Sequence, residues 1–368
     1  MHIVIDCRFI NHSGLGRYIR EIVSRLVKNT KNNFTLIISK NEVNYEFLKK
    51  CDENNVKYIY INAKMYSIKE QLELPFKIPK CDIFWAPHYN APILLVRANK
   101  KIVTIHDMGH ISVNEDLSFI KKLYAKILMY TSTHFYDKIF TVSNFSKTEI
   151  IKYEKIDSNK IHVYYCGVDL KKYTGKCYDM LNIIKKYDVP SKYFLYVGNV
   201  KPHKNILRLI EGFAKFSMDN EDIKLLIVGK KDGLLTGVKG LEELINKYDI
   251  KDKIIFTGFV DDEDLALLYN RAEAFIFPSL YEGFGIPPLE AMAFNCPVLS
   301  SNKASLPEIY GDSVLYIDPF SVEDIARGMK EIIKKEIKNN LILKGKKKIN
   351  EYSWDNTAKE IENNIFRD

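Results

Sequence analysis

Short apolar runs alternate with longer amphipathic segments along almost the whole chain. Seven runs in the first half and six in the second predict buried strands, at residues 2–6, 34–39, 57–61, 82–86, 101–107, 138–143 and 161–165, and then 193–198, 224–229, 253–259, 274–279, 297–301 and 314–318. Near-continuous apolar strands separated by helices are typical of parallel sheets that are covered on both faces. The pattern therefore predicts an α/β protein built from doubly wound parallel sheets.

The two halves of this pattern begin in the same way. Residues 4–27 and residues 193–216 each run from a strand through a polar loop into an amphipathic helix. We therefore expect two Rossmann-like domains, at 1–172 and 193–353, joined by a lysine-rich linker at 173–192, with a last helix at about 354–368 that packs back on the first domain. Two such domains facing each other would leave a cleft at the carboxyl ends of their strands, where these folds bind ligands.

Composition narrows the class of protein without identifying it. Of the 368 residues, 46% are apolar and 28% charged, which excludes a disordered or collagen-like chain. The net charge of +8 favours an anionic partner of any kind. Six cysteines without a C-x-x-C pair, and no apolar run of about 20 residues, favour a reducing, cytoplasmic location without a membrane span. The apolar start at 2–6 is expected to be a strand and not a signal peptide.

Basic residues open the first helix of each half, where the helix dipole disfavours cations. They are Arg17 and Arg20 after Gly14 and Gly16 in the first half, and Lys201, His203 and Lys204 before Asn205, the expected N-cap, in the second. A local rule broken twice at equivalent positions indicates a bound anion. A nucleotide diphosphate accounts for both turns, with Lys204 as the direct contact; two ordinary solvated basic turns are the alternative.

Two common nucleotide motifs fit poorly. The first loop reads G-L-G-R-Y-I, without the third glycine of a dinucleotide fingerprint. Residues 39–41 are Ser, Lys and Asn, where a ribose-binding acid would be expected. No Walker sequence is present, so the chain favours neither an NAD site nor a P-loop.

The segment 274–301 carries the most chemical information. A buried strand is followed by Gly283 and Gly285, which allow a tight turn and a close approach to a ligand. A helix is expected from Pro287 to a C-cap at Asn295. Glu282, at the mouth of the loop, and Glu290, expected in the first helical turn, form an E-x7-E pair that would face one pocket; an acid that only stabilises the helix dipole is the alternative for the second glutamate.

Two further groups of residues bear on metal or acid–base chemistry. His106, at the end of a strand, is either a site residue or a structural histidine; a two-histidine metal site with His110 lacks a third ligand at suitable spacing. Asp262, Glu263 and Asp264 match a D-x-D metal motif, but they directly precede an apolar helix and are better explained as an N-capping acidic cluster. The sequence predicts no metal.

With these residues in view, the chain resembles the family-4 retaining glycosyltransferases of the GT-B fold. The resemblance rests on SLYEGFGIPPLEAMA (279–293), and on DCRFINHSGLGRY, TIHDMGH, TVSNFSKTEI, YVGNVKPHKN, FTGFV and SSNKASLPE, which follow in the order that the family shows. The chain is similar in particular to bacterial mannosyltransferases of polysaccharide and O-antigen assembly.

The resemblance implies a role for each matching residue. Lys204 would bind the donor diphosphate, Glu282 the hydroxyls of the donor sugar and Glu290 the ribose, while His106 would lie beside the reacting sugar. The remaining donor contacts would come from Gly14, Gly16, Asn199, Gly283, Phe284, Gly285 and Ile286, with Phe259 and Val260 at the base. Asn199 and His203 stand where relatives often carry arginine, so the second cationic contact falls to Lys201, His203 or Arg17.

The implied activity is transfer of a sugar from a nucleotide-diphosphate donor, with retention and without metal or cofactor, to a glycan or lipid-linked acceptor. Mannose from GDP-mannose is drawn from the resemblance alone. A catalytically inactive sugar-nucleotide-binding protein, and an epimerase or phosphorylase on the same fold, are the alternatives. Nucleic acid is not an expected partner, because no recognition motif accompanies the positive charge.

Two lysine-containing segments bear on membrane contact. Residues 117–135 combine an apolar stripe with Lys121, Lys122 and Lys126, and residues 344–348 read KGKKK. An internal helix that covers the first sheet, and a solvated helix face, are the more common explanations. Peripheral contact with the cytoplasmic face of a membrane stays open as the alternative.

Overall fold

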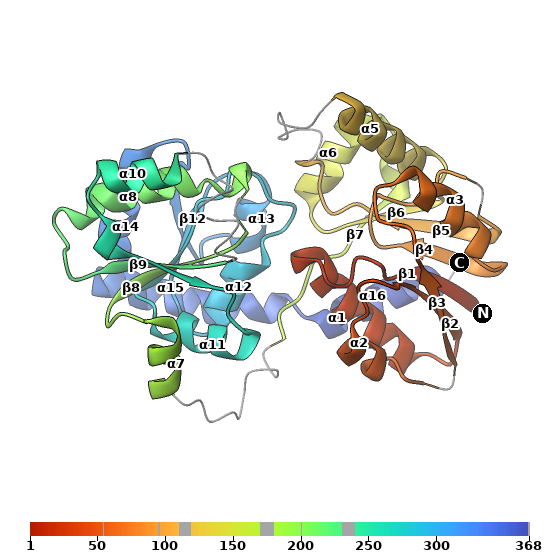
Figure 1. The fold of residues 1–368 in the computed structure, drawn as a ribbon, viewed down its shortest axis with the longest axis horizontal. Helices are drawn as coiled ribbons and strands as arrows, with labels where there is room; N and C mark the ends of the chain where they lie inside the picture. The colour runs from red at the N-terminus through yellow and green to blue at the C-terminus, as the bar shows by residue number, and fades with distance from the viewer. Residues whose placement is uncertain are drawn as a thin grey trace. The chain divides into compact units, whose positions relative to one another are not determined.

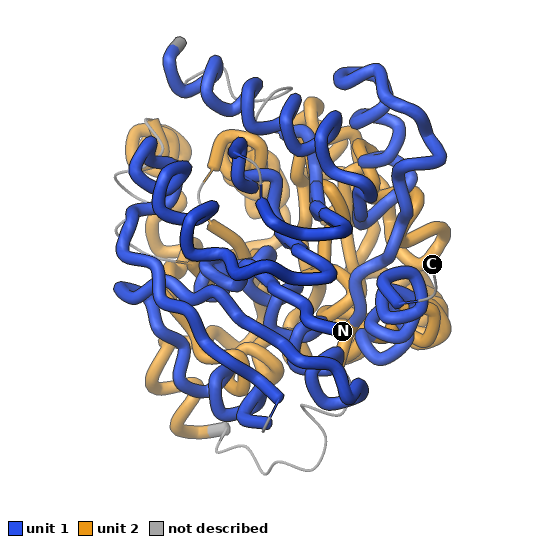
Figure 2. Tube along the Cα trace, turned by 90° about the vertical axis from the view of Figure 1, so that its right-hand side faces the viewer, with its two compact units in different colours: residues 1–167, 354–368 blue, residues 168–353 orange. Residues whose placement is uncertain are grey.

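The computed structural model describes residues 1–53, 55–94, 96–109, 119–169, 180–199, 201–229 and 240–366. The chain divides into two compact units, residues 1–167 with 354–368 and residues 168–353, coloured separately in Figure 2. His110, the first part of the expected linker (173–179) and residues 117–118 lie outside the described residues. Each unit is an α/β sandwich around a parallel sheet.

The first unit contains a seven-stranded parallel sheet in the order β3-β2-β1-β4-β5-β6-β7. Its strands are β1 (His2–Asp6), β2 (Asn33–Ser39), β3 (Val56–Ile61), β4 (Cys81–Ala86), β5 (Ala98–Thr104), β6 (Lys138–Thr141) and β7 (Ile161–Val163). Its helices are α1 (Ser13–Asn29), α2 (Tyr45–Lys50), α3 (Ile68–Lys77), α5 (Phe119–His134), α6 (Asn144–Glu154) and α16 (Trp354–Phe366), with the 3-10 turn η1 (Ser158–Lys160). In Figure 1, α1, α2 and α16 cover one face of the sheet and α3, α5 and α6 the other.

The second unit contains a six-stranded parallel sheet in the order β10-β9-β8-β11-β12-β13. Its strands are β8 (Tyr193–Val197), β9 (Lys224–Val228), β10 (Ile254–Gly258), β11 (Ala274–Phe277), β12 (Val298–Ser301) and β13 (Leu315–Ile317). Its helices are α7 (Met180–Tyr187), α8 (Ile206–Ser217), α10 (Leu241–Lys247), α11 (Asp262–Arg271), α12 (Ile286–Ala293), α13 (Leu306–Tyr310), α14 (Val322–Ile332) and α15 (Lys335–Lys348), with 3-10 turns η3 (Pro202–Lys204), η4 (Lys251–Lys253) and η5 (Ile349–Glu351). Helices α8, α10 and α14 cover one face and α11 and α12 the other (Figure 1).

All thirteen expected strands are present, and both sheets are parallel throughout. The strands pair in parallel because each one is reached through a crossover, and the apolar runs are buried because helices cover both faces. The register Phe194–Ala274 between β8 and β11 joins two strands that are 80 positions apart in sequence. The fold class expected from the sequence is confirmed.

The linker is shorter than its expected range of 173–192. Helix α7 lies within that range, and its last residues are fixed to the second unit because Lys186 and Tyr187 both donate to Asp264 Oδ2, each at 2.8 Å. The first unit ends at Gly167, five residues before the expected boundary, and α16 returns to it through an ion pair between Arg25 and Asp355 at 2.6 Å. In the part of the chain that is described, no helix combines the length and the apolar character that crossing a bilayer requires.

Candidate functional site

The second sheet has its topological switch between β8 and β11. The connection from β8 leads outward to β9, and the chain returns to place β11 on the other side of β8. In parallel sheets the loops that follow two such strands separate and leave room for a ligand at the carboxyl edge. The two loops here are residues 198–205 after β8 and residues 278–285 after β11.

Hydrogen bonds hold these two loops against each other. The Leu280 backbone N–H donates to His203 O at 2.7 Å. The buried Asn205 side chain donates to Pro278 O at 3.1 Å and to Pro319 O at 2.7 Å. Asn205 was expected to cap helix α8 with its side chain. It occupies the N-cap position with a φ of 60° but makes no capping bond, because its Oδ1 accepts from Arg208 Nη1 at 3.1 Å while its NH2 group donates across the loops.

Lys204 and Glu282 meet at this edge, one from each loop. Lys204 Nζ lies 2.5 Å from Glu282 Oε1, with 19% and 13% of the two side chains exposed. The ammonium also lies 5.5 Å from the centroid of the Phe277 ring. A lysine supplies a point charge for phosphate oxygens, and a carboxylate accepts hydrogen bonds from sugar hydroxyls. Sequence spacing cannot show this pair, because its members are 78 positions apart.

The turn at residues 283–285 is fixed from a different segment of the chain. Gly285 has a φ of 87°, and a Cβ at this position would lie 2.2 Å from Tyr310 Oη. That hydroxyl donates to Gly285 O at 2.6 Å, and Ser305 Oγ donates to Glu282 O at 2.9 Å. Ser305 and Tyr310 hold the loop backbone through these hydrogen bonds. The sequence did not predict this role, since no spacing relates the two residues to the loop.

Glu290 is buried on α12, with Tyr269 Oη donating to its Oε2 at 3.4 Å. The first-turn position expected for it is wrong: α12 begins at Ile286, so Glu290 is the fifth residue of the helix. Its alternative explanation as a helix-terminal acid is weakened accordingly, because dipole effects fall off within the first turn. The expected C-cap also shifts, since Phe294 is the C-cap and Asn295 follows it in a left-handed conformation with φ 60°.

Two buried hydroxyls lie next to this cluster. Ser279 is the second residue after β11 and Tyr196 lies on β8, and neither hydroxyl has a hydrogen-bond partner among the described residues. Burial raises the pKa of Tyr196, and the negative charge of Glu282 raises it further. Buried hydroxyls without partners are costly, so both are candidates for bonds to a ligand. The sequence analysis did not identify either.

The remaining predicted site residues of the second unit lie in two places, the loop after β8 and the loop after β10. Asn199 and Lys201 are exposed, while His203 is half-buried and fixed to the β11 loop through its carbonyl. Phe259 is exposed and Val260 buried; both follow β10, which lies two strands from β8. The structure thus brings Lys204, the 282–285 turn and its helix together, and leaves the expected base-binding residues further along the same sheet.

Helix α1 of the first unit begins earlier than expected. It starts at Ser13, so Gly14 and Gly16 are in its first turn and not in a preceding loop. A Cβ on Gly16 would lie 2.2 Å from Ile10 O, which explains glycine at that position by packing. Arg20 donates to Ile10 O at 2.5 Å and has a structural role, while Arg17 is half-buried.

His106 follows β5 in the first unit. Its Nε2 is 3.0 Å from Pro87 O, so this nitrogen carries a proton and Nδ1 is the acceptor of the neutral ring. The ring packs edge-on against Tyr18, with centroids 4.8 Å apart. Burial lowers the pKa of His106, although the Pro87 carbonyl and Asp107 act in the opposite sense. The imidazole is therefore held in one orientation and kept neutral near pH 7.

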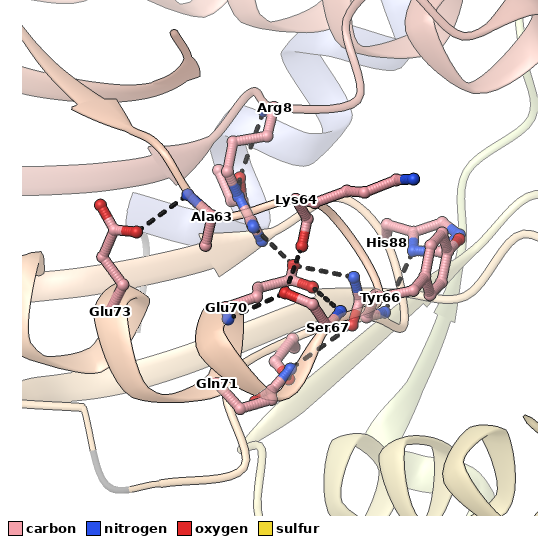
Figure 3. Close-up of polar contacts among 12 residues, drawn as sticks. Arg8, Ala63, Lys64, Tyr66, Ser67, Glu70, Gln71, Glu73 and His88 are labelled. Carbon is pink, nitrogen blue, oxygen red and sulfur yellow. Dashed lines mark hydrogen bonds and ion pairs between the residues drawn. The ribbon is translucent and has the colours of Figure 1, made fainter. Parts of the chain in front are cut away.

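A buried charge network lies at the switch between β1 and β4 of the first sheet (Figure 3). Arg8 is fully buried and binds Asp6 Oδ2 at 2.6 Å and Glu70 Oε1 at 2.5 Å. Asn90 donates to the same oxygen of Glu70 at 2.9 Å. These carboxylates raise the pKa of Arg8 although burial acts to lower it. The network ties the end of β1 to α3.

The acidic cluster at residues 262–264 forms the first turn of α11, in agreement with the expectation that these residues belong to a helix N-terminus and not to a metal motif. The capping detail differs, since Asp261 is the N-cap and makes no side-chain capping bond. Asp264 is fixed by α7, and the hydrogen bonds from Lys186 and Tyr187 lower its pKa against the effect of burial. Within the described ranges, no three His, Cys, Asp or Glu side chains are placed to hold a metal ion.

Each unit has a doubly wound parallel sheet with a polar cluster at the point where the strand order reverses. This architecture identifies the class of fold. The fold is GT-B, and the structure of HepE from Anabaena in complex with UDP-glucose matches 99% of this chain and 99% of that one with a TM-score of 0.77 at 16% identity. The sucrose-phosphate synthase of Thermosynechococcus elongatus matches 100% of this chain and 98% of that one, with a TM-score of 0.75 at 17% identity.

Sequence comparison then gives the family. Residues 12–172 match the model of Glycosyltransferase Family 4, and residues 181–349 match that of Glycosyl transferases group 1. The O-antigen chain mannosyltransferase B of Escherichia coli is 30% identical over 291 residues, covering 76% of this chain and 73% of that protein. The O-antigen chain mannosyltransferase RfbU of Salmonella typhimurium is 31% identical over 255 residues, 69% of this chain and 66% of that protein. The chain belongs to the group 1 glycosyltransferases, with a family 4 N-terminal region.

Proposed function

We propose that this glycosyltransferase transfers a hexose, mannose from GDP-mannose, to a glycan or lipid-linked acceptor in surface polysaccharide assembly, with retention at the anomeric carbon. The sugar and the pathway are supported by the relatives, two of which are named as O-antigen chain mannosyltransferases. The single structural observation that carries the proposal is the meeting of Lys204 and Glu282 at the switch of the second sheet.

In this proposal the second unit binds the donor. Lys204 contacts the diphosphate and stabilises the negative charge that develops on it as the glycosidic bond to the phosphate breaks. Glu282 accepts hydrogen bonds from the hydroxyls of the sugar, and Glu290 accepts them from the ribose. The backbone of residues 283–286 approaches the phosphate and sugar, which the absence of a side chain at Gly283 and Gly285 permits.

The acceptor hydroxyl attacks the anomeric carbon from the face that the phosphate leaves, through an oxocarbenium-like state. The hydroxyl oxygen forms the new bond, the diphosphate takes the bonding electrons, and the proton of the hydroxyl passes to the departing phosphate oxygen. No side chain is assigned as a covalent nucleophile. Lys204 and the α12 N-terminus supply the charge stabilisation, so we propose that the reaction does not require a metal.

The first unit contributes the remaining predicted residues. We propose that His106, held neutral by burial, contacts the reacting sugar. Gly14 leaves the exposed start of α1 free of a side chain, whereas Gly16, which we also propose as a donor contact, is buried against Ile10 O. Arg17 is the candidate for the second cationic contact with the diphosphate. Lys201 and His203 are its alternatives on the second unit.

Thermal stabilisation by a panel of nucleotide sugars tests the donor, because a ligand that binds only the folded chain raises its apparent stability. We expect GDP-mannose to raise Tm more than UDP-glucose or GDP alone. NMR of the product should show the same anomeric configuration as the donor, and excess EDTA should leave the rate unchanged.

Three outcomes would contradict the proposal in different ways. Donor binding without product on any acceptor would identify a sugar-nucleotide-binding protein. Interconversion of the nucleotide sugar without an acceptor would identify an epimerase, and transfer that requires inorganic phosphate in place of the acceptor hydroxyl would identify a phosphorylase. Inversion at the anomeric carbon would overturn the mechanism while leaving the transferase activity.

A further inference from the structure

The helix at residues 119–134 does more than cover the first sheet. Leu128, Met129 and Ser132 of α5 are buried against it, as an internal helix requires. The opposite side of α5 is also apolar, and there Ile120, Leu123, Ile127 and Tyr130 are exposed, with Ile120 at 77%. Their spacing of three and four residues places them in one stripe along the outer face of the helix.

Helix α3 repeats this arrangement. Ile68, Leu72 and Phe76 follow one another at intervals of four residues and are exposed, Phe76 at 84%. The inner face of α3 carries Gln71 and Leu74, both buried. Two neighbouring surface helices thus present large apolar side chains outward, where water would favour polar ones.

Residues 91–94 join the two helices into one surface. The Ile93 backbone N–H donates to Gln71 Oε1 of α3 at 2.9 Å. On the other side, Tyr136 Oη donates to Pro92 O at 3.3 Å, just beyond the end of α5. Ile93 and Leu94 between these anchors are themselves exposed. We call the surface formed by α3, residues 91–94 and α5 the apolar face.

The apolar face gathers much of the exposed apolar surface of the described residues. Nine of the 20 large apolar side chains that are exposed there lie on it, and Phe135, directly after α5, is a tenth at its edge. A pocket of about 160 Å³ opens in the face, lined by Ile93, Leu94, Val96, Lys101, Phe135 and Tyr136. Soluble proteins seldom expose contiguous apolar patches of this kind unless the patch binds something.

The charges on the face indicate what binds there. Residues 119–134 contain lysines and no Asp or Glu; Lys126 is exposed beside the stripe, and Lys121 is exposed in the first turn of the helix. On α3, Lys69 is exposed, whereas Glu70 is buried against Arg8 and Glu73 is paired with Lys77 at 2.8 Å. Apolar stripes flanked by lysines are suited to the interface of a bilayer with anionic headgroups.

A second copy of the chain fits this face less well. A twofold interface brings the same surface of each copy together, so Lys121 and Lys126 of one copy would lie near those of the other. Like charges brought together at an interface oppose association. Anionic phospholipid meets both the apolar stripe and the lysines at once.

We propose that the apolar face docks the first unit on an anionic phospholipid bilayer, with the α3 and α5 stripes in the headgroup–acyl boundary and the lysines on phosphate groups. This is a peripheral contact through two helices and the segment between them. It does not depend on the transfer reaction, and its test uses neither donor nor acceptor, so its failure and that of the proposed function are distinguishable.

Co-sedimentation of the full chain with vesicles tests the proposal. We expect binding to phosphatidylcholine vesicles that contain about 30 mol% phosphatidylglycerol, and at least tenfold weaker binding to phosphatidylcholine alone. The variant Lys121→Glu with Lys126→Glu should lose this preference, since each lysine near an anionic surface contributes roughly fivefold in affinity. Lys346→Glu with Lys347→Glu, an exposed pair on α15, is the matched control and should bind as the unaltered chain does.

The apolar part is tested in the same assay. Ile120→Ser with Leu123→Ser and Ile127→Ser should weaken binding at least tenfold, and Phe76→Ser alone should weaken it measurably because α3 belongs to the same face. The matched control replaces Leu181, Met218 and Leu343, which are also exposed, by serine in the second unit. Circular dichroism and Tm show whether each variant is folded.

Three results would overturn the proposal. One is equal binding to neutral and anionic vesicles. Another is equal loss of binding in the variants and in their controls. The third is absence of vesicle binding together with a dimer that the α5 triple variant abolishes in sedimentation analysis, which would make the face a contact between protein chains.

Discussion

Lys204 Nζ lies 2.5 Å from Glu282 Oε1, so the cation assigned to the diphosphate is neutralised by the carboxylate assigned to the sugar. In the proposed function, a donor would bring its own negative charge to the ammonium and its own hydroxyls to the carboxylate. The ion pair would then hold both side chains in position before the donor arrives, and donor binding would exchange one set of partners for another.

Removal of the ammonium should abolish most of the transfer. We expect Lys204→Ala to lower kcat/KM by at least about a hundredfold, because the charge that develops on the leaving diphosphate is no longer stabilised. Tm should change little, since both members of the pair are partly exposed to solvent. Lys215→Ala is the control, since Lys215 pairs with the exposed Glu323 in the same unit. Near-normal turnover of the Lys204 variant would remove this residue from the mechanism.

Removal of the negative charge of Glu282 should strengthen binding of the free nucleoside diphosphate while it weakens transfer. In Glu282→Gln the lysine loses a negatively charged competitor, so we expect calorimetry to show tighter binding of the free nucleoside diphosphate. Transfer should fall by at least tenfold, because the amide is a weaker acceptor for the sugar hydroxyls. Unchanged affinity for the diphosphate would show that the ion pair does not compete with the ligand.

The turn at Gly285 should be sensitive to a single methyl group. Gly285→Ala combines a φ of 87° with a Cβ 2.2 Å from Tyr310 Oη, so we expect a loss of at least about 2 kcal/mol in the free energy of unfolding. Gly14→Ala is the matched control: a Cβ there meets nothing within 4 Å, and helical alanine is favoured by up to about 1 kcal/mol. Urea unfolding measures both. A cost at Gly285 no larger than at Gly14 would contradict the packing described.

Arg8 and Arg327 each bridge two carboxylates, one pair buried and one exposed, so their removal compares the effect of burial on the free energy of unfolding. Arg8 binds Asp6 and Glu70 in the interior of the first unit, and Arg327 binds Asp324 and Glu331 at the surface of the second. Arg8→Met leaves two buried carboxylates without their cation and should cost about 3–5 kcal/mol. Arg327→Met should cost no more than about 1 kcal/mol. Similar costs in urea unfolding would mean that the Arg8 network is hydrated.

The His106 imidazole should titrate below its ordinary range. Burial lowers its pKa from 6.5, so the unfolded chain binds the proton more readily than the folded chain. This contribution to stability is complete above about pH 6.5 and decreases as the pH falls from there toward the lower pKa of the folded chain. NMR of the ring should show more neutral than protonated His106 at pH 6.5, and His106→Asn should reduce the loss of stability below that pH. A measured pKa above 6.5 would contradict this.

The sequence predicted the strands and the order of motifs better than the contacts between them. Apolar runs located every strand, because buried parallel strands are apolar throughout. The start of α1 was misplaced because Gly14 and Gly16 resemble loop residues, whereas Gly16 is needed for packing against Ile10 O inside the helix. Asparagine is a residue type that often caps helices, but the Asn205 amide instead donates to Pro278 O in the other loop. These outcomes depend on tertiary contacts that local pattern does not contain.

The candidate site was predicted as separate motifs and not as an assembly. Lys204, Glu282 and Glu290 were identified by type and spacing. The side chains that support them, Ser305 and Tyr310, come from a segment whose sequence carries no spacing signal toward the loop. For α5, the sequence left an internal helix and a membrane-facing helix as alternatives and did not separate them, because both faces of the helix are apolar, one buried and one exposed.

The phenol of Tyr310 occupies the space where a side chain on residue 285 would have to go, and it also binds that residue's carbonyl. A side chain at position 285 is therefore excluded while Tyr310 keeps its hydroxyl, and Leu306 Cδ2, 2.9 Å from the same point, restricts the space further. A lineage that gained a side chain at position 285 would have to give up the aromatic hydroxyl at position 310, and with it the tether that shapes the glutamate loop.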